Sequence, residues 1–204
     1  IDEFNISQKI IHDLCDGIRS DIKKKVKLNS KKDLLVYSYR VAGTVGLMMA
    51  KILKVSKKKS LKSAIDLGIA MQLTNISRDV IEDSKNNRFY INENFEEILS
   101  TIKLADIFYK NSFYAIKDIP ISFRFSILVA RRVYRKIGYK IINQHNFKNY
   151  KNSGRIYVSN IEKTLETFFS IFDLIRLSLS NRNKDETEHA HLLINEEINL
   201  DERI

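Results

Sequence analysis

The sequence predicts an all-α fold with a single core, and its composition supports that prediction. The chain of 204 residues contains Gly 6 and Pro 1, so the two residues that disfavour helices most strongly are scarce. It is 44% hydrophobic, which is enough for a substantial core in one domain of this length. No repeat or internal boundary interrupts the chain, and we therefore expect residues 1–181 to form one helical domain.

Short polar segments divide this domain into its expected helices. Asn29 and Ser30, the lysine cluster that starts at Lys57, and Asn87 separate the first four, because Asn and Ser favour turns and Asn tolerates a left-handed backbone. Pro120 suits the opening of the fifth helix. The expected helices are residues 5–26, 31–54, 57–85, 94–117, 121–146 and 157–181. Residues 182–204 are polar and charged, and we expect a partly disordered surface tail there.

Charge and cysteine content restrict the partners and the compartment. The formal net charge is +10, but the lysine clusters lie at expected helix ends and are not interleaved with aromatic residues, so we expect no nucleic-acid partner. Attraction to an anionic membrane surface is the weaker alternative use of this charge. Cys15 is single, which fits a reducing, cytoplasmic compartment. No segment reaches the roughly 18 apolar residues needed to cross a bilayer, so membrane contact would be peripheral, on the inner face.

A polar stripe stands out within the expected helix 57–85. In a helix of 3.6 residues per turn, four oxygen-bearing side chains fall within an arc of roughly 80°: Gln72, Asn75, Asp79 and Asp83. Mg²⁺ takes oxygen ligands and is commonly held by one or two carboxylates together with phosphate oxygens of a substrate. The stripe therefore indicates a metal site, and the alternative is a solvated helix face with a chance spacing of aspartates.

A second unusual segment lies upstream, from Tyr37 to Ile52. It contains a long uncharged run in which Gly43, Gly46 and Ala50 share one helical face. Glycine inside a helix costs roughly 1 kcal/mol relative to alanine, so two glycines within one turn indicate a close approach to the backbone. A neighbouring helix is the more frequent cause of such an approach, and a ligand is the alternative.

Together, the two segments resemble the signatures of the squalene and phytoene synthase family, the head-to-head prenyl-diphosphate synthases. The first signature is matched by Tyr37, Ser38, Val41, Ala42, Gly43, Val45, Gly46, Met49 and Ile52. The second is matched by Leu67, Gly68, Gln72, Asn75, Arg78, Asp79, Asp83, Arg88 and Tyr90. The family usually has proline where this chain has Asn92, a departure that falls in a loop.

The resemblance extends from about Asp16 to Lys163 and is closest to bacterial-type phytoene synthases. Ala130–Gly138 looks like the family's A-x-x-x-Y-R-x-I segment, and Gly154–Ser159 looks like its late basic stretch. The family's first acidic motif lies upstream of anything seen here, since Asp16–Asp21 resembles a later segment. We therefore expect the C-terminal two-thirds of an isoprenoid-synthase-type helical bundle around a central cavity, truncated at its N-terminus.

The resemblance also implies a role for individual residues. The metal ligands would be Asn75, Asp79 and Asp83. The residues that contact the diphosphate would be Gln72, Tyr134 and Arg155. The tunnel for the isoprenoid tail would be lined by Val41, Ala42, Val45 and Gly46. Tyr37 would be an active-site tyrosine, or else a buried tyrosine with a satisfied hydroxyl, and Arg78 would orient a catalytic carboxylate.

The implied reaction condenses two geranylgeranyl diphosphates through a cyclopropyl diphosphate into phytoene and releases pyrophosphate. It would depend on Mg²⁺, with Mn²⁺ as a substitute, and would need no NADPH. One alternative is a C15 synthase that makes presqualene diphosphate, squalene or dehydrosqualene. Another is a non-catalytic family member that acts as an assembly factor, although the four polar residues of the stripe argue against it. The sequence predicts no oligomeric state.

Overall fold

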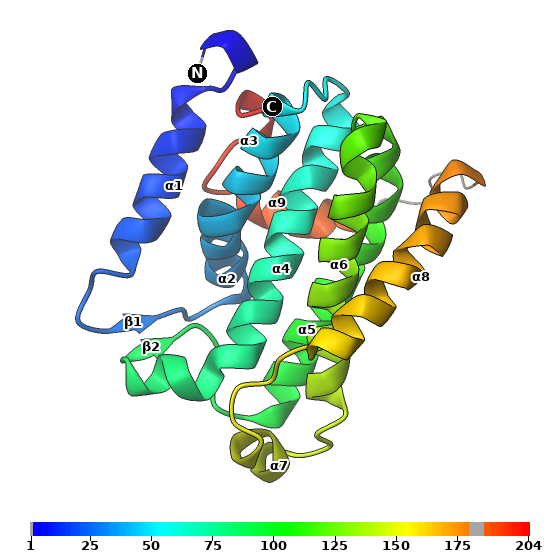
Figure 1. Cartoon of the computed structure of the whole chain (residues 1–204). Helices are drawn as coiled ribbons and strands as arrows, with labels where there is room; N and C mark the ends of the chain where they lie inside the picture. Colours follow the sequence, from blue (N-terminus) through cyan, green and yellow to red (C-terminus); the bar gives the residue numbers. More distant parts are fainter. Residues whose placement is uncertain (1, 180–185) are drawn as a thin grey trace.

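The computed structural model describes residues 2–179 and 186–204 and confirms the all-α fold class (Figure 1). The helices are α1 (Gln8–Ser20), α2 (Lys31–Ser38), α3 (Thr44–Ile52), α4 (Lys58–Lys85), α5 (Phe95–Phe113), α6 (Ile121–Ile142), α7 (Phe147–Asn152), α8 (Asn160–Leu179) and α9 (Glu188–Asn195). Short 3₁₀ segments span Asp2–Phe4, Tyr114–Asp118 and Leu200–Glu202. Among the described helices, none combines the length and the apolar character needed to cross a membrane.

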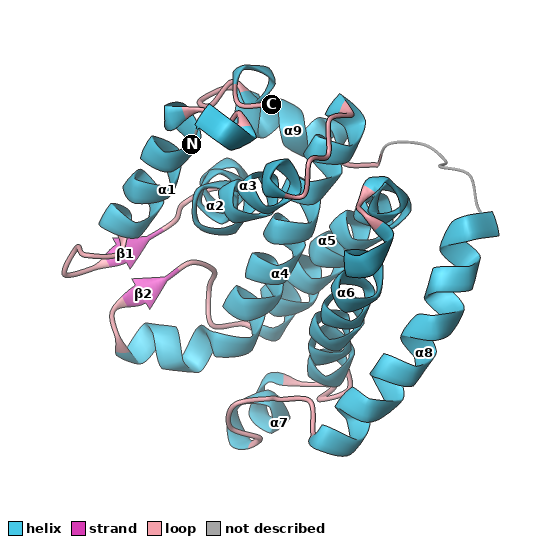
Figure 2. Ribbon diagram, turned by 45° about the horizontal axis from the view of Figure 1, so that its top comes forward, coloured by secondary structure: helices cyan, strands magenta, loops and turns pink. Residues whose placement is uncertain are grey.

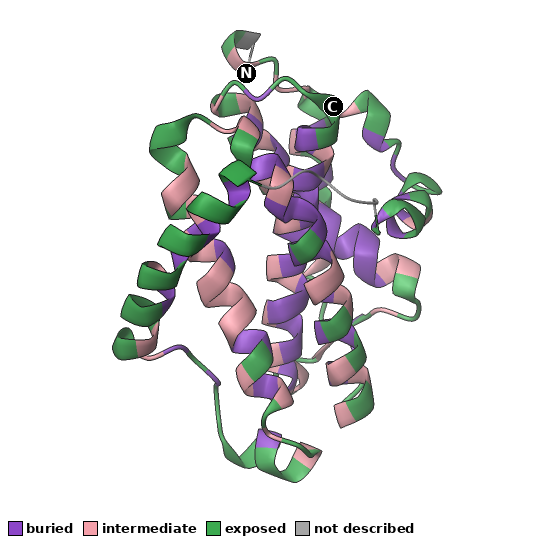
Figure 3. Ribbon diagram, turned by 90° about the vertical axis from the view of Figure 1, so that its right-hand side faces the viewer, coloured by how far each residue is buried: buried purple, intermediate pink, exposed green. Residues whose placement is uncertain are grey.

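Helix α4 is the central element, with α3 and α6 on either side of it and α5 packed along it (Figures 1 and 2). Its residues Ile65, Ile69 and Leu73 are fully buried, as are Ile98 and Phe108 of α5. Figure 3 shows the buried residues gathered on these central helices. Burial of large aliphatic and aromatic side chains is the main stabilising contribution to such a bundle. The core therefore holds the polar stripe of α4 in a fixed orientation.

The expected helix 31–54 is continuous but contains a π-helical turn, Tyr39–Gly43, between α2 and α3. Helix packing explains the glycines on either side of the α3–α4 contact. A Cβ atom on Gly46 would overlap the carbonyl oxygen of Ala64, and one on Gly68 would overlap that of Ala42. The two backbones thus lie in direct contact, which only residues without side chains permit.

The first expected helix, 5–26, is too long at its C-terminal end, because α1 ends at Ser20. The chain instead turns and forms a short strand β1 (Val26–Lys27), which pairs in parallel with β2 (Arg88–Phe89) just beyond α4. Asn87 adopts a positive φ of 58° there, as expected for the residue that ends the long helix. This pairing carries the end of α1 to the end of α4, a contact that local sequence patterns do not reveal.

The expectation of a surface tail at 182–204 is wrong for the part that the structure describes. Helix α9 packs against α2, and Ala190, Ile194, Ile198 and Leu200 are buried in the main core. These apolar residues alternate with charged ones, so the average composition of the segment is polar even though one side of it is apolar. Residues 182–185, and the last two residues of the expected helix 157–181, lie outside the described residues.

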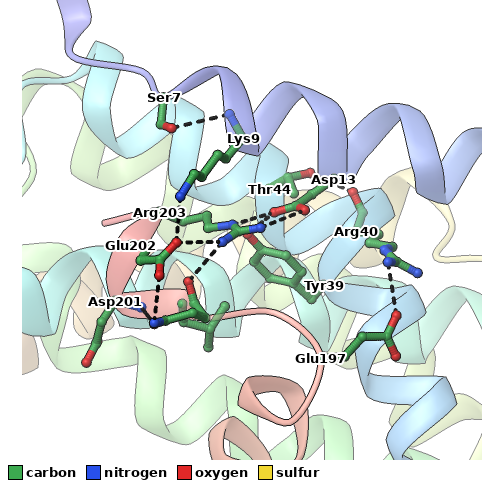
Figure 4. Close-up of polar contacts among 12 residues, drawn as sticks. Ser7, Lys9, Asp13, Tyr39, Arg40, Thr44, Glu197, Asp201, Glu202 and Arg203 are labelled. Carbon is green, nitrogen blue, oxygen red and sulfur yellow. Dashed lines mark hydrogen bonds and ion pairs between the residues drawn. The ribbon is translucent and has the colours of Figure 1, made fainter.

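Buried polar contacts tie this C-terminal segment to the domain. His191 Nε2 lies 2.6 Å from Asp66 Oδ1, and both side chains are buried. Arg203 Nε donates to Asp13 Oδ2 at 2.9 Å, and the Tyr39 hydroxyl donates to the same oxygen at 3.1 Å (Figure 4). A nearly buried ion pair is stable only when its remaining polar atoms are also hydrogen-bonded, as they are here. The end of the described chain is therefore an integral part of the fold.

Candidate functional site

An apolar cavity of ≈ 380 Å³ lies between the π turn and α3 on one side, and α4 and α6 on the others. Its lining combines residues predicted to hold the isoprenoid tail with residues predicted to bind the diphosphate or the metal. The tunnel residues among its lining are Val41, Ala42, Val45 and Gly46. The predicted diphosphate and metal residues among its lining are Gln72, Asn75 and Tyr134, and three serines also line it: Ser60, Ser63 and Ser112. The cavity is therefore mainly apolar, and its amide and phenol groups come from α4 and α6.

Asn75 is the most informative of these polar groups. Its side-chain oxygen Oδ1 is buried and has no hydrogen-bond partner among the described residues. An acceptor left unpaired away from water costs about 1–3 kcal/mol, so this oxygen is available to accept from or coordinate a bound species. A neutral oxygen of this kind suits a hard cation such as Mg²⁺.

Asp79 lies one turn further along α4 and is held by two arginines. Arg78 Nε donates to its Oδ1 at 2.8 Å, so Arg78 lies where it can orient this carboxylate. Arg155 Nε lies 3.4 Å from the same oxygen, and its Nη1 lies 3.7 Å from Glu82 Oε2. Arg155 is more than half exposed, with 60% of its side chain accessible. It therefore stands at the acidic end of the stripe and not in the cavity wall.

Asp83 continues the stripe toward the end of α4. Burial raises the pKa of its carboxyl from 3.8 to about 6, and the nearby Asp79, Glu82 and Asp21 add to the increase. Arg88 acts in the opposite direction. Negative charge accumulates here without a full complement of cations, which is the environment that a bound metal ion relieves.

The donor set fits magnesium that is shared with a phosphate. Within residues 2–179 and 186–204, no three His, Cys, Asp or Glu side chains lie together so that they could hold a metal ion by themselves. One helix face instead offers the carboxylates of Asp79 and Asp83 and the orphaned amide oxygen of Asn75. Mg²⁺ typically keeps open positions for substrate oxygens and binds few protein ligands.

Tyr37 belongs to a tyrosine–carboxylate cluster beside the acidic end and is not part of the cavity lining. Its hydroxyl donates to Asp21 Oδ2 at 2.8 Å and lies 3.0 Å from the Tyr90 hydroxyl, which donates to Asp21 Oδ1 at 2.8 Å. The two rings stack with centroids 4.7 Å apart. Burial raises the pKa of both tyrosines well above the ordinary value, so both hydroxyls stay protonated.

Sequence reasoning gave no site role to Asp21, Tyr90 or the short helix α7. The β1–β2 pairing that brings Asp21 to α4 has no local signal, whereas Tyr90 stood within the second signature. Tyr150 of α7 donates to the Ser77 carbonyl at 2.8 Å, which fixes the segment leading to Arg155 against α4. The sequence around α7 is rich in asparagine, which is typical of loops, so neither the helix nor the contact made by Tyr150 was predicted.

Comparisons with known proteins agree in describing one family. Residues 1–95 match a family model described as squalene/phytoene synthase. The 15-cis-phytoene synthase of Paracoccus sp. (strain N81106 / MBIC 01143) is 35% identical over 63% of this chain and 48% of its own length. The phytoene synthase of Pseudescherichia vulneris is 34% identical over 67% of this chain and 50% of its own. Phytoene synthase 1, chloroplastic, of Zea mays is 28% identical over 90% and 50%.

A solved structure extends the likeness to three dimensions. The crystal structure of a dehydrosqualene synthase in complex with ligand superimposes with a TM-score of 0.69 at 27% identity. The match covers 84% of this chain and 66% of that one. The chain spans about half the length of the curated relatives it matches.

Proposed function

Since this chain belongs to the squalene/phytoene synthase family and has its isoprenoid-synthase helical fold, we propose that the whole protein is a prenyltransferase that makes phytoene. It would condense two geranylgeranyl diphosphates head to head, through a cyclopropyl diphosphate, and release pyrophosphate without NADPH. The observation that carries this proposal is the apolar cavity whose lining includes Asn75, a residue with a buried and unpaired side-chain oxygen. A substrate with a long hydrocarbon tail and a diphosphate head needs both features together.

Each residue of the site has a task in this chemistry. The cavity wall from Val41 to Gly46 takes the isoprenoid tail and excludes water from the allylic cation. Gln72 and Tyr134 present hydrogen-bonding groups toward the diphosphate, and Arg155 lies at the acidic end, where it can neutralise the leaving group. Magnesium held by Asn75, Asp79 and Asp83 would supply the positive charge that stabilises the departing pyrophosphate.

Tyr37 contributes beside the acidic end of the stripe. Its ring is fixed by the stack with Tyr90, and an aromatic face stabilises nearby positive charge. Its hydroxyl is held protonated by burial and by the Asp21 carboxylate. The tyrosine can therefore face a carbocation without reacting as a phenolate.

A C15 head-to-head synthase, which condenses two farnesyl diphosphates, is the second candidate, because the solved structural neighbour is a dehydrosqualene synthase. The test incubates the whole enzyme and Mg²⁺ with geranylgeranyl or farnesyl diphosphate, with and without NADPH, and identifies hydrocarbons by mass spectrometry. Phytoene formed without NADPH supports the first candidate. Hydrocarbon from farnesyl diphosphate alone supports the second, and no hydrocarbon from either rejects both. We propose a cytoplasmic location for the reaction, because the single Cys15 suits a reducing compartment.

A further inference from the structure

A second cavity, of ≈ 600 Å³, lies among α5, α6, α8 and the 3₁₀ segment Tyr114–Asp118. Figure 1 shows α8 alongside α6 at this place. Tyr134 of α6 lines the apolar cavity described above, whereas Arg131 and Arg135 of the same helix line the second one. In the part of the chain that the structure describes, no residue lines both cavities. The second cavity is therefore separate from the candidate site for the reaction.

The lining of the second cavity carries an excess of positive charge. Its cationic side chains are Lys110, Arg131, Arg132, Arg135, Lys136 and Arg176. Its acidic side chains are Glu166, Asp173 and Glu186. Cations of the lining thus outnumber carboxylates two to one. A concave site lined mainly by one sign of charge concentrates ions of the opposite sign, so this cavity attracts anions.

Ion pairs satisfy only part of this positive charge. The carboxylates of Glu166, Asp173 and the neighbouring Asp106 pair with four of the six cations: Lys110, Arg132, Arg135 and Lys136. Among the described residues, the other two, Arg131 and Arg176, form no ion pair with a carboxylate. The charge of these two guanidiniums is therefore left for a ligand.

Arg131 is the buried member of this pair, with 5% of its surface exposed. Its Nε and Nη2 both donate to the Tyr109 carbonyl, at 3.0 and 2.7 Å, and its Nη1 donates to none of the described residues. Burial and the nearby Arg135 guanidinium lower the pKa of Arg131 to about 10. A neutral carbonyl does not cancel the charge, and a buried charge without a counter-ion is costly. A bound anion would remove that cost.

The Phe113 ring brings Arg176 close to Arg131. The guanidinium carbons of Arg131 and Arg176 lie 4.9 and 5.4 Å from the centroid of this ring, so they are at most about 10 Å apart. Arg176 is exposed and comes from α8, whereas Arg131 comes from α6. A guanidinium presents a rigid fork of donors that matches the oxygens of a phosphate group. The cavity also has the volume of a small-molecule site, roughly 300–1,000 Å³.

We propose that this cavity binds a phosphate-bearing small molecule, whose phosphate oxygens accept hydrogen bonds from the guanidiniums of Arg131 and Arg176. The bound phosphate supplies the counter-ion that Arg131 lacks, and it links α6 to α8. Binding of this kind requires no Mg²⁺ and no residue of the apolar cavity. It therefore stands or falls independently of the proposed reaction.

The test is isothermal titration calorimetry of the purified protein with inorganic pyrophosphate and, separately, with inorganic phosphate. The buffer has constant ionic strength and contains EDTA, which removes the divalent cation that the candidate metal site would need. At least one of the two anions is expected to bind with a Kd of about 1 mM or lower. Arg176→Gln should raise this Kd by about tenfold, because a charge-assisted pair is lost. Arg131→Gln should raise it at least as much.

Two matched controls make the same change of charge elsewhere. Lys163→Gln removes an exposed cation of α8 that does not line the cavity, and Arg155→Gln removes the arginine at the acidic end of the α4 stripe. Each should leave the Kd within about twofold. Circular dichroism confirms that each variant is folded, and Arg176, being exposed, can be replaced without disturbing the core.

Three results overturn the proposal. The first is that neither anion binds to the unaltered protein. The second is that Lys163→Gln weakens binding as much as Arg176→Gln does, because the attraction would then reflect net charge alone. The third is that Arg155→Gln weakens binding and Arg176→Gln does not, because the anion would then occupy the candidate site for the reaction.

Discussion

The Tyr37 hydroxyl lies 2.8 Å from a carboxylate oxygen of Asp21, although the two residues belong to separate segments at the ends of α2 and α1. Asp21→Asn should lower the free energy of unfolding by about 1.5–3 kcal/mol, because a half-buried charged acceptor is lost. Tyr37→Phe should cost much less in that background than alone, giving a coupling of about 1 kcal/mol in a double-mutant cycle. Urea denaturation measures both. The control is Asp16→Asn, whose exposed partner is Arg19, and additive effects at Tyr37 and Asp21 would contradict the coupling.

Asp79→Asn and Asp83→Asn should each lower kcat of the whole enzyme by about 10²-fold or more, since the leaving pyrophosphate loses its metal-mediated stabilisation. Steady-state hydrocarbon production measures this. Glu96→Gln is the matched control, because it removes an exposed carboxylate from a different helix, and its rate should stay near normal. Near-normal rates in both aspartate variants would reject the metal assignment.

Asp83 predicts a specific pH dependence of stability. Its folded pKa is raised to about 6 from 3.8, so between these values the native state holds a proton that the unfolded chain has released. The contribution of Asp83 to the free energy of unfolding should therefore fall by about 1 kcal/mol as pH rises from about 4 through 6, once partial solvent exposure is considered. Carboxyls whose pKa is lowered, such as those of Asp106 and Asp118, contribute in the opposite direction, so the effect is the difference in slope between the unaltered chain and Asp83→Asn. Urea denaturation across this range, without divalent metal, measures it. Asp83→Asn should remove the decrease, and an unchanged slope in that variant would show that another group causes it.

Gly46→Ala and Gly68→Ala should each destabilise the fold by about 2 kcal/mol or more, because the added methyl group meets a backbone carbonyl that cannot move aside. Thermal unfolding measures the loss. Gly138→Ala is the graded control, since its Cβ would meet the side chain of Ile102 at 3.2 Å, which can adjust. Equal losses at all three positions would argue against backbone contact as the cause.

Ile194→Ala tests whether the C-terminal segment belongs to the core. The residue is 0% exposed, so its truncation should cost about 2–4 kcal/mol. Leu192→Ala, in the same helix at 59% exposure, should cost less than about 0.5 kcal/mol. If chemical denaturation shows a similarly small loss of unfolding free energy for both substitutions, the segment is a surface tail and not part of the core.

The parts of the fold that could be predicted are those with a local period. Spacing alone placed Gln72, Asn75, Asp79 and Asp83 on one face of α4, and the structure sets the first two against the cavity. Scarce glycine and proline predicted the long helices. Asp21 could not be predicted as a partner of Tyr37, because β1–β2 pairing over a long stretch of chain brings them together. Helix α9 and the 3₁₀ turn after it were missed for a related reason: Ile194 and Leu200 become core residues only through packing against distant helices.

The π turn at Tyr39–Gly43 holds one residue more than a regular α-helical turn. Because the extra residue is taken up within the turn, the helical segments on either side keep the registry of a continuous helix. Deleting one residue there should convert the turn into α-helix and leave Val45 and Met49 in the wall they now form. A deletion within α3 would instead rotate every later side chain of that helix by about 100°. The turn is therefore the place in this wall where chain length can change without reorienting the side chains that follow.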